Sequence, residues 1–240
     1  MAVKIYAVHD KSGYAGSGTG ASGYDSVHDT QQAKNAFFAQ EDGTQGVRVQ
    51  GNASTVNIFR AFFEFNVPED APSTIQSLTL NIKGKGSNND LDVIVIEGTQ
   101  DASSGDDGDG TDYGSTVFNA FTGWGPGWDE ADVTEYSSEV TSWSNSDYNT
   151  ITLNATARAA FTPNATFKVV LMSHDYDYLD VNPTSSNIDQ SIDFHLQGSG
   201  TSQDVYIEYE IPDPRDITGP LKIQAGAKFK ISAGKLTIKT

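Results

Sequence analysis

The chain has 240 residues, of which 23 are Gly, 12 Phe, 10 Tyr and 3 Trp, and it has no Cys. This composition favours a large all-β protein with many turns, and it excludes a disulfide framework while leaving the compartment open. The net charge of −17 argues against binding to phosphate backbones. Nucleic acid is therefore not an expected partner. No apolar run is long enough to cross a membrane, so a membrane is not an expected partner either.

The N-terminal quarter is expected to hold two short strands separated by a long loop. Residues Val3–Val8 read as the first strand, and the N-terminus lacks the features of a signal peptide. Residues 9–45 are rich in Gly, Ser and Asp, with the stretch GYAGSGTGASGY at their centre, and they read as a surface loop interrupted by one apolar stop at 36–39. Residues Gly46–Gln50 read as a second, short strand.

The clearest strand signal is Asn57–Val67, with the sequence NIFRAFFEFNV. Its alternation predicts a core face made of Phe59, Ala61, Phe63, Phe65 and Val67. The opposite face also carries apolar residues, among them Ile58 and Phe62, so burial on both sides of this strand stays an open alternative.

The middle and the end of the body add more strands and two short helical segments. Val133–Trp143 has apolar residues at helical spacing and is predicted to form a short helix, and Ala155–Phe161 a helical turn. The further predicted strands are Thr74–Lys85, Leu91–Glu97, Tyr148–Leu153, Phe167–Ser173, Ser191–Leu196 and Asp204–Ile211.

The last residues differ from the rest in charge and pattern. The stretch PDPRDITGP predicts a linker over 212–220, which divides a sandwich domain at 1–211 from a segment at 221–240. In that segment the unit KIQAG recurs as KISAG, apolar residues alternate with polar ones, and five Lys with one Asp over 216–240 give +4. These features predict a strand-forming attachment or oligomerisation device. Its expected assembly residues are Leu221, Ile223, Phe229, Ile231, Leu236 and Ile238.

Three stretches of the body resemble the DNRLRE-type β-sandwich modules and related phage structural proteins. They are IFRAFFEFNVPEDAPSTIQSLTLNI, DVTEYSSEVTSWSNSDYNTITLN and SQDVYIEYEI, within residues 1–211. The resemblance implies a jelly-roll-like antiparallel β-sandwich, here with a C-terminal β-strand appendage. It also implies a structural or carbohydrate-associated role on cell surfaces or virions, and it brings no catalytic residues.

An acidic loop is the candidate metal site. The stretch GDDGDGTD places Asp106, Asp107, Asp109 and Asp112 among glycines, and several carboxylates in tight turns suit Ca²⁺. The spacing does not match an EF-hand, and a solvated acidic loop is the alternative. Ca²⁺ is therefore the one cofactor considered, and none is required.

Two aromatic loops are the candidate carbohydrate site. Trp124 and Trp128 lie in GWGPGW, and Tyr176 and Tyr178 lie in HDYDYLD, beside Asp residues that could accept hydrogen bonds from hydroxyl groups. The alternative is that the Trp side chains close one end of the sandwich. The four His form no HxH or HExxH motif, so zinc is not expected, and no nucleophile or nucleotide motif predicts an enzyme.

These observations predict a non-enzymatic structural protein of a phage-like virion or an extracellular assembly, located in the virion or outside the cell. Its partners would be copies of itself or other assembly proteins. The alternative is a carbohydrate-binding adhesin module that contacts surface glycans.

Overall fold

Two antiparallel β-layers make up the body, which confirms the prediction of an all-β sandwich. The computed structural model describes residues 2–8, 11–18, 24–29, 35–38, 46–52, 55–88, 91–100, 117–125, 127–183, 188–195, 204–211, 228–232 and 235–239. The strands are β1 Ala2–Tyr6, β2 Gly13–Gly18, β3 Asn35–Phe38, β4 Val47–Asn52, β5 Thr55–Asn66, β6 Ser77–Asn88, β7 Val93–Glu97, β8 Tyr148–Thr152, β9 Thr166–Ser173, β10 Ile188–Phe194, β11 Tyr206–Glu210, β12 Lys228–Ser232 and β13 Lys235–Lys239. The helical elements are α1 Tyr24–His28, η2 Val117–Asn119, α2 Ala155–Ala160 and the π-helical turn η3 His174–Tyr178.

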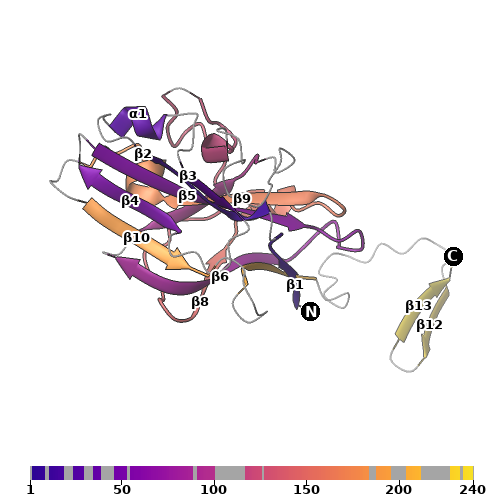
Figure 1. The fold of residues 1–240 in the computed structure, drawn as a ribbon. Coiled ribbons are helices and arrows are strands. Elements are labelled where there is room, and N and C mark those ends of the chain that lie inside the picture. Colours follow the sequence, from indigo (N-terminus) through magenta and orange to yellow (C-terminus); the bar gives the residue numbers. More distant parts are fainter. Residues whose placement is uncertain are drawn as a thin grey trace.

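The two layers share one long strand. The first layer is β1-β11-β6-β8, and the second contains β10-β4-β5-β2-β3, with β9 and then β7 continuing from β5 (Figure 1). The first half of β6 pairs with β11 and β8, whereas its second half, from Gly84, pairs with β10. Because β6 belongs to both layers, the strands form one continuous hydrogen-bonded body.

The inner core lies between the layers. β6 contributes Leu78, Leu80 and Ile82, and β5 contributes Ala61, Phe63 and Phe65, all of which are fully buried. This face of β5 is the one that the alternation of the sequence predicts, although its first member, Phe59, is only partly buried. The period-2 pattern therefore assigns the inner face correctly.

The other face of β5 is buried as well. Ile58 and Phe62 belong to a second apolar group, here called the outer cluster. Its buried members are Ala15, Tyr24, Val27, Val56, Ile58, Phe62, Ile94, Ile96, Phe118, Phe121, Trp128, Val170, Met172 and Tyr178. α1, η2 and η3 supply part of this cluster, and Figure 1 shows α1 on the outer side of the second layer.

The expectation of a surface loop over 9–45, broken only by an apolar stop at 36–39, is wrong at its glycine-rich part. The glycine-rich stretch Gly13–Gly18 is strand β2, and it pairs with both β3 and β5. A Cβ atom added at Gly16 would lie 2.2 Å from the ring of Phe59, so the glycine lets the ring pack against the strand. The many glycines of this stretch indicated a loop. In the structure Gly16 instead allows an aromatic ring to pack closely against the strand.

The expected helix at Val133–Trp143 is also wrong. This segment is extended and forms isolated bridges with β7, in which Glu135 pairs with Ile96 and Val140 pairs with Val93. The amide of Tyr136 donates to the carbonyl of Val95 at 2.8 Å. The edge of β7 offers these backbone partners, and they outweigh a weak helical pattern. The helical turn expected near Ala155 is confirmed as α2.

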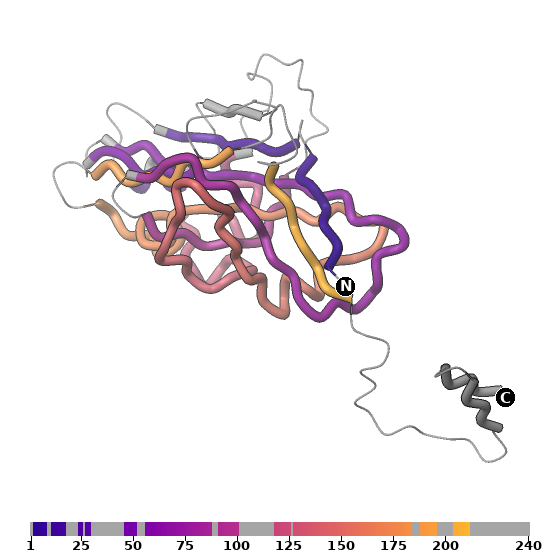
Figure 2. The backbone as a smooth tube through the Cα atoms, turned by 90° about the horizontal axis from the view of Figure 1, so that it is seen from below, coloured from indigo at the N-terminus to yellow at the C-terminus, as the bar shows by residue number. Residues whose placement is uncertain are grey.

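β12 and β13 form a separate two-stranded antiparallel sheet. β1 lies beside β11, with Ala2 opposite Glu210, so the first and the last described strands of the body are neighbours in one sheet (Figure 2). None of the helices in the described ranges is long and apolar enough to span a membrane. The linker expected at 212–220 lies outside the described residues, so the domain boundary stays a prediction.

Candidate functional site

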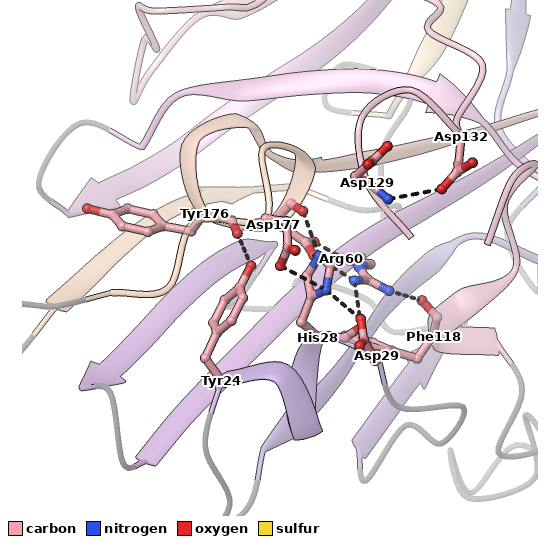
Figure 3. Close-up of polar contacts among 10 residues, drawn as sticks. Tyr24, His28, Asp29, Arg60, Phe118, Asp129, Asp132, Tyr176 and Asp177 are labelled. Atoms are coloured by element: carbon pink, nitrogen blue, oxygen red, sulfur yellow. Dashed lines mark hydrogen bonds and ion pairs between the residues drawn. The ribbon is translucent and has the colours of Figure 1, made fainter. Parts of the chain in front are cut away.

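A buried ion pair lies within the outer cluster. Arg60 extends from β5, and its Nε and Nη2 atoms donate to the two carboxylate oxygens of Asp177 at 2.7 and 2.6 Å. Both side chains have no exposed surface. Bidentate geometry of this kind fixes both orientation and distance, so the pair ties η3 to the central strand of the second layer (Figure 3).

The same guanidinium group also holds the segment that contains η2. Nη1 of Arg60 donates to the carbonyl of Phe118 at 2.8 Å, and the guanidinium carbon lies 3.9 Å from the centre of the Phe118 ring. Desolvation strengthens such a cation–π contact. One side chain therefore joins three segments that are distant in sequence.

His28 completes the buried network at the end of α1. Its Nε2 lies 2.8 Å from the carbonyl oxygen of Asp177, and its Nδ1 lies 2.8 Å from a carboxylate oxygen of Asp29. Both neighbouring atoms are acceptors, so both contacts are hydrogen bonds only when each ring nitrogen carries a proton. The imidazole stacks on Trp128, with ring centres 4.4 Å apart.

Tyr24 anchors the other end of α1. Its hydroxyl donates to the backbone carbonyl of Tyr176. Burial raises the pKa of the Tyr24 phenol, and the negative charges of Asp177 and Asp180 raise it further, so the group is a neutral donor at physiological pH. Partial burial also raises the pKa of Asp180, which lies two residues after η3 and has a positive φ of 50°.

The four aromatic residues predicted to bind carbohydrate have different positions. Trp128 is 1% exposed and Tyr178 is 5% exposed, so both rings are packing residues in this conformation. Trp124 is half-buried against the outer cluster. Tyr176 is half-buried too, but it packs against the inner core, and Figure 3 shows its ring pointing away from the Arg60 network. The four rings therefore do not form one continuous platform.

The carboxylates of the HDYDYLD stretch are divided in the same way. Asp177 is buried and paired with Arg60, so it is not a free acceptor for a ligand. Asp175 and Asp180 are exposed. Leu179 and Val181 add exposed apolar surface beside them, at 38% and 48% exposure. The segment after η3 thus presents apolar and acidic groups together.

The sequence predicted no functional role for Arg60 or His28, and it assigned Asp177 to hydrogen bonds with a ligand, whereas the structure pairs Asp177 with Arg60. One signal was available, because Arg60 lies two residues from Ile58 and two from Phe62 on the same face of a strand. A charged residue between two apolar neighbours on a buried face needs a buried partner of opposite charge. Nothing in the sequence identifies that partner, which is 117 residues away.

The remaining predicted residues are only partly described. Asp106, Asp107, Asp109 and Asp112 lie outside the described residues, as do Leu221 and Ile223, so the predicted calcium loop stays a prediction. In the hairpin the register pairs Phe229 with Ile238 and Ile231 with Leu236. Alternate residues of a strand share a face, so these four apolar positions belong to one face of the hairpin.

One group within the described ranges has the composition of a metal site. It consists of Glu139, His174 and Asp175, whose ligand atoms lie within 4.8 Å of one another. Asp92 is close by, and its pKa is raised by burial and by the negative charges of Asp175 and Glu139.

Comparison with known proteins does not assign the chain to a family. No family model matches it, and no curated protein matches it.

Proposed function

We propose that this chain is a non-enzymatic structural protein of a phage-like virion or another extracellular assembly. In this proposal the sandwich is displayed and the C-terminal strands attach it. The observation that carries the proposal is the separate sheet of β12 and β13, whose strands pair with each other and with no other strand in the described part of the chain. The resemblance of residues 1–211 to DNRLRE-type modules agrees with this role.

A two-stranded hairpin needs a partner. An isolated hairpin is marginally stable in water, and it gains stability by adding strands or by covering an apolar face. The register gives β12 and β13 one face with Phe229, Ile231, Leu236 and Ile238. The outer edges of the two strands are also templates for a further strand. We infer that the occupant of this face and edge is the same hairpin of another copy.

The distribution of charge supports attachment at this end. Residues 216–240 have a net charge of +4, from five Lys and one Asp. Because the whole chain has a net charge of −17, the rest of the chain has a net charge of −21. Acidic bodies repel one another, which keeps them apart at the surface of an assembly. Because the basic hairpin reduces the net charge of each copy from −21 to −17, it lowers the repulsion between whole copies.

Two substitutions in the hairpin test the proposal in the full-length chain. Ile231→Asp places a charge on the apolar face, and Thr237→Asp places the same charge at a position opposite Lys230, on the other face. We expect the unmodified chain and Thr237→Asp to form oligomers or filaments, and Ile231→Asp to remain monomeric in multi-angle light scattering. A monomeric unmodified chain at tens of micromolar, or equal assembly of both variants, would contradict the proposal.

A carbohydrate-binding adhesin is the second candidate. It is favoured by the half-buried Trp124, which keeps exposed surface over a cluster that Arg60 makes rigid, and by the exposed Asp175 and Asp180 in the neighbouring segment. Apolar ring faces and carboxylate acceptors together suit a sugar ring with its hydroxyl groups. Because Trp128 is 1% exposed, it supports the loop without touching a ligand.

A glycan array tests this candidate. Trp124→Ala should remove binding to the recognised glycan, whereas Tyr6→Ala should retain it. Tyr6 is a suitable control because it is an exposed aromatic residue, at 43%, on β1 of the other layer. Absence of any specific glycan signal, or equal loss in both variants, argues against an adhesin.

A further inference from the structure

A histidine and two carboxylates converge at the start of η3. Nδ1 of His174 lies 3.0 Å from Oδ1 of Asp175 and 3.2 Å from Oε1 of Glu139. The imidazole is 16% exposed, and the two carboxylates are exposed at 54% and 38%, so an ion from solvent can reach them. A single nitrogen thus faces two carboxylate oxygens that come from separate segments.

The backbone holds these groups in place without a ligand. The amide of His174 donates to the carbonyl of Asp92 at 2.8 Å, and the amide of Val140 donates to the carbonyl of Val93 at 2.8 Å. These two bonds fix both segments to the same end of β7. The imidazole also stacks on Tyr178, whose hydroxyl donates to Glu135. The fold therefore fixes the backbone of both segments and the ring of His174, and it brings the side chains of Glu139 and Asp175 to the same nitrogen atom.

The distances suit an ion with short ligand bonds. An ion with bonds of about 2.1 Å separates neighbouring ligand atoms by about 3.0 Å in an octahedral site and about 3.4 Å in a tetrahedral one. The distances from Nδ1 of His174 to the two carboxylate oxygens, 3.0 and 3.2 Å, lie in this range, and all three ligand atoms lie within 4.8 Å of one another. The 3.0 Å contact with Asp175 is a hydrogen bond in the absence of an ion, so a bound ion would take the place of the proton on Nδ1. Ca²⁺ takes oxygen ligands at longer distances, whereas imidazole nitrogen suits Zn²⁺ and its neighbours in the transition series.

We propose that Glu139, His174 and Asp175 bind a divalent transition-metal ion, with Zn²⁺ as the best fit. The bound ion links the extended segment at 138–140 to η3, and so it holds two covering segments of the second layer to each other. This site is separate from the acidic loop that the sequence analysis assigned to Ca²⁺, and it does not depend on the proposed function.

Calorimetric titration of the chelator-treated full-length chain with ZnCl₂ tests the site. We expect the chain to bind one equivalent of Zn²⁺ tightly. The substitutions Glu139→Gln and His174→Ala should each raise the dissociation constant for Zn²⁺ by about tenfold or more. Glu130→Gln is the matched control, because Glu130 is an exposed glutamate outside the group, and it should bind as the unmodified chain does. Asp175→Asn, at a strongly exposed position, gives a third variant if His174→Ala does not fold.

Two further readouts decide the identity of the ligands. In nuclear magnetic resonance spectra the first equivalent of Zn²⁺ should shift the imidazole signals of His174 and leave those of His195 in place. Excess CaCl₂ should not displace the bound Zn²⁺, because Ca²⁺ prefers oxygen ligands to imidazole nitrogen. The proposal is overturned if no tight equivalent binds, if His174→Ala binds Zn²⁺ unchanged, or if CaCl₂ competes fully.

Discussion

Arg60 and Asp177 connect segments that the sequence separates by 117 residues. The pair has no contact with solvent, and its value for stability depends on every donor and acceptor being satisfied. Asp177 receives both donors of the guanidinium fork, and Phe118 receives a third. The arrangement makes η2 and η3 parts of the rigid body, although both lie in connecting segments.

Removing one partner of this pair should destabilise the fold strongly. We expect Asp177→Ala and Arg60→Ala each to lower the free energy of unfolding by about 3–5 kcal/mol, because each leaves an unpaired buried charge. The double variant should cost less than the sum of the two. Chemical denaturation followed by tryptophan fluorescence measures all three.

A partly exposed pair provides the comparison. Arg48 donates to Asp189 at 2.7 Å, with side chains exposed at 20% and 40%. Arg48→Ala should cost about 1 kcal/mol or less, because solvent screens the charges. Equal costs for Arg48→Ala and Arg60→Ala would show that burial does not set the strength of the Arg60 pair.

Asp193 on β10 should make stability depend on pH. Burial raises the pKa of Asp193, while Arg48 and Lys85 lower it and Asp189 raises it, with a net increase. The folded protein then binds the proton more tightly than the unfolded chain. The associated stability is complete below the unfolded pKa of about 3.9, and it is lost as the pH rises through the folded pKa.

Asp193→Asn tests this assignment, because the amide does not ionise. The difference in free energy of unfolding, variant minus unmodified chain, should be more positive at pH 7 than at pH 3. Urea denaturation at the two pH values measures it. A difference that is constant, or that falls toward pH 7, would contradict a raised pKa.

At the scale of elements, β5 is a strand with two buried faces. Phe63 faces the inner core and Phe62 faces the outer cluster, and neither has exposed surface. β9 pairs with β5 and repeats the arrangement, with Val169 opposite Phe63 and Val170 opposite Phe62. The centre of the second layer is thus covered on both sides, as in sheets that lie between two packed layers.

Truncation of either ring should therefore be costly. We expect Phe63→Ala and Phe62→Ala each to lower the free energy of unfolding by about 3–5 kcal/mol, because each loses transfer energy and leaves a cavity. Thermal melts with calorimetry measure both. Lys235→Ala in the hairpin is the control, and it should change the free energy of unfolding by less than about 0.5 kcal/mol. If Phe62→Ala melts like the unmodified chain, the outer cluster is not a packed core.

At the scale of the whole molecule, an acidic body and a basic hairpin have different physical roles. The described residues of the body form eleven strands in one hydrogen-bonded system, and those of the hairpin form two. Under the proposed function, the body would fold through its own contacts and the hairpin would contribute the interface between copies. Unfolding of the body and loss of assembly should then be separate events.

Deletion of residues 212–240 tests this separation. The truncated chain should keep the melting temperature and the circular dichroism spectrum of the body, because the described strands of the hairpin pair only with each other. It should also lose self-association in analytical ultracentrifugation. An unfolded or strongly destabilised truncated chain would show that the C-terminal segment is part of the sandwich.

The sequence by itself determined the class of the fold and most of its strands. Period-2 alternation marks β5 and the start of β6 because a strand with a buried face imposes that pattern on the chain. The sequence also determined the reversed charge and the apolar face of the hairpin, because both depend on composition and spacing within a few residues. Such local properties do not require knowledge of distant contacts.

The tertiary structure alone decided what covers the outer face of β5. The pairing of Arg60 with Asp177, the stacking of His28 on Trp128, and the meeting of Glu139 with His174 all join distant segments. The extended form of Val133–Trp143 has the same origin, because the edge of β7 supplies hydrogen bonds that a helix would otherwise make internally. Contacts across long sequence separations depend on how the layers fold together, and no local pattern in the chain encodes them.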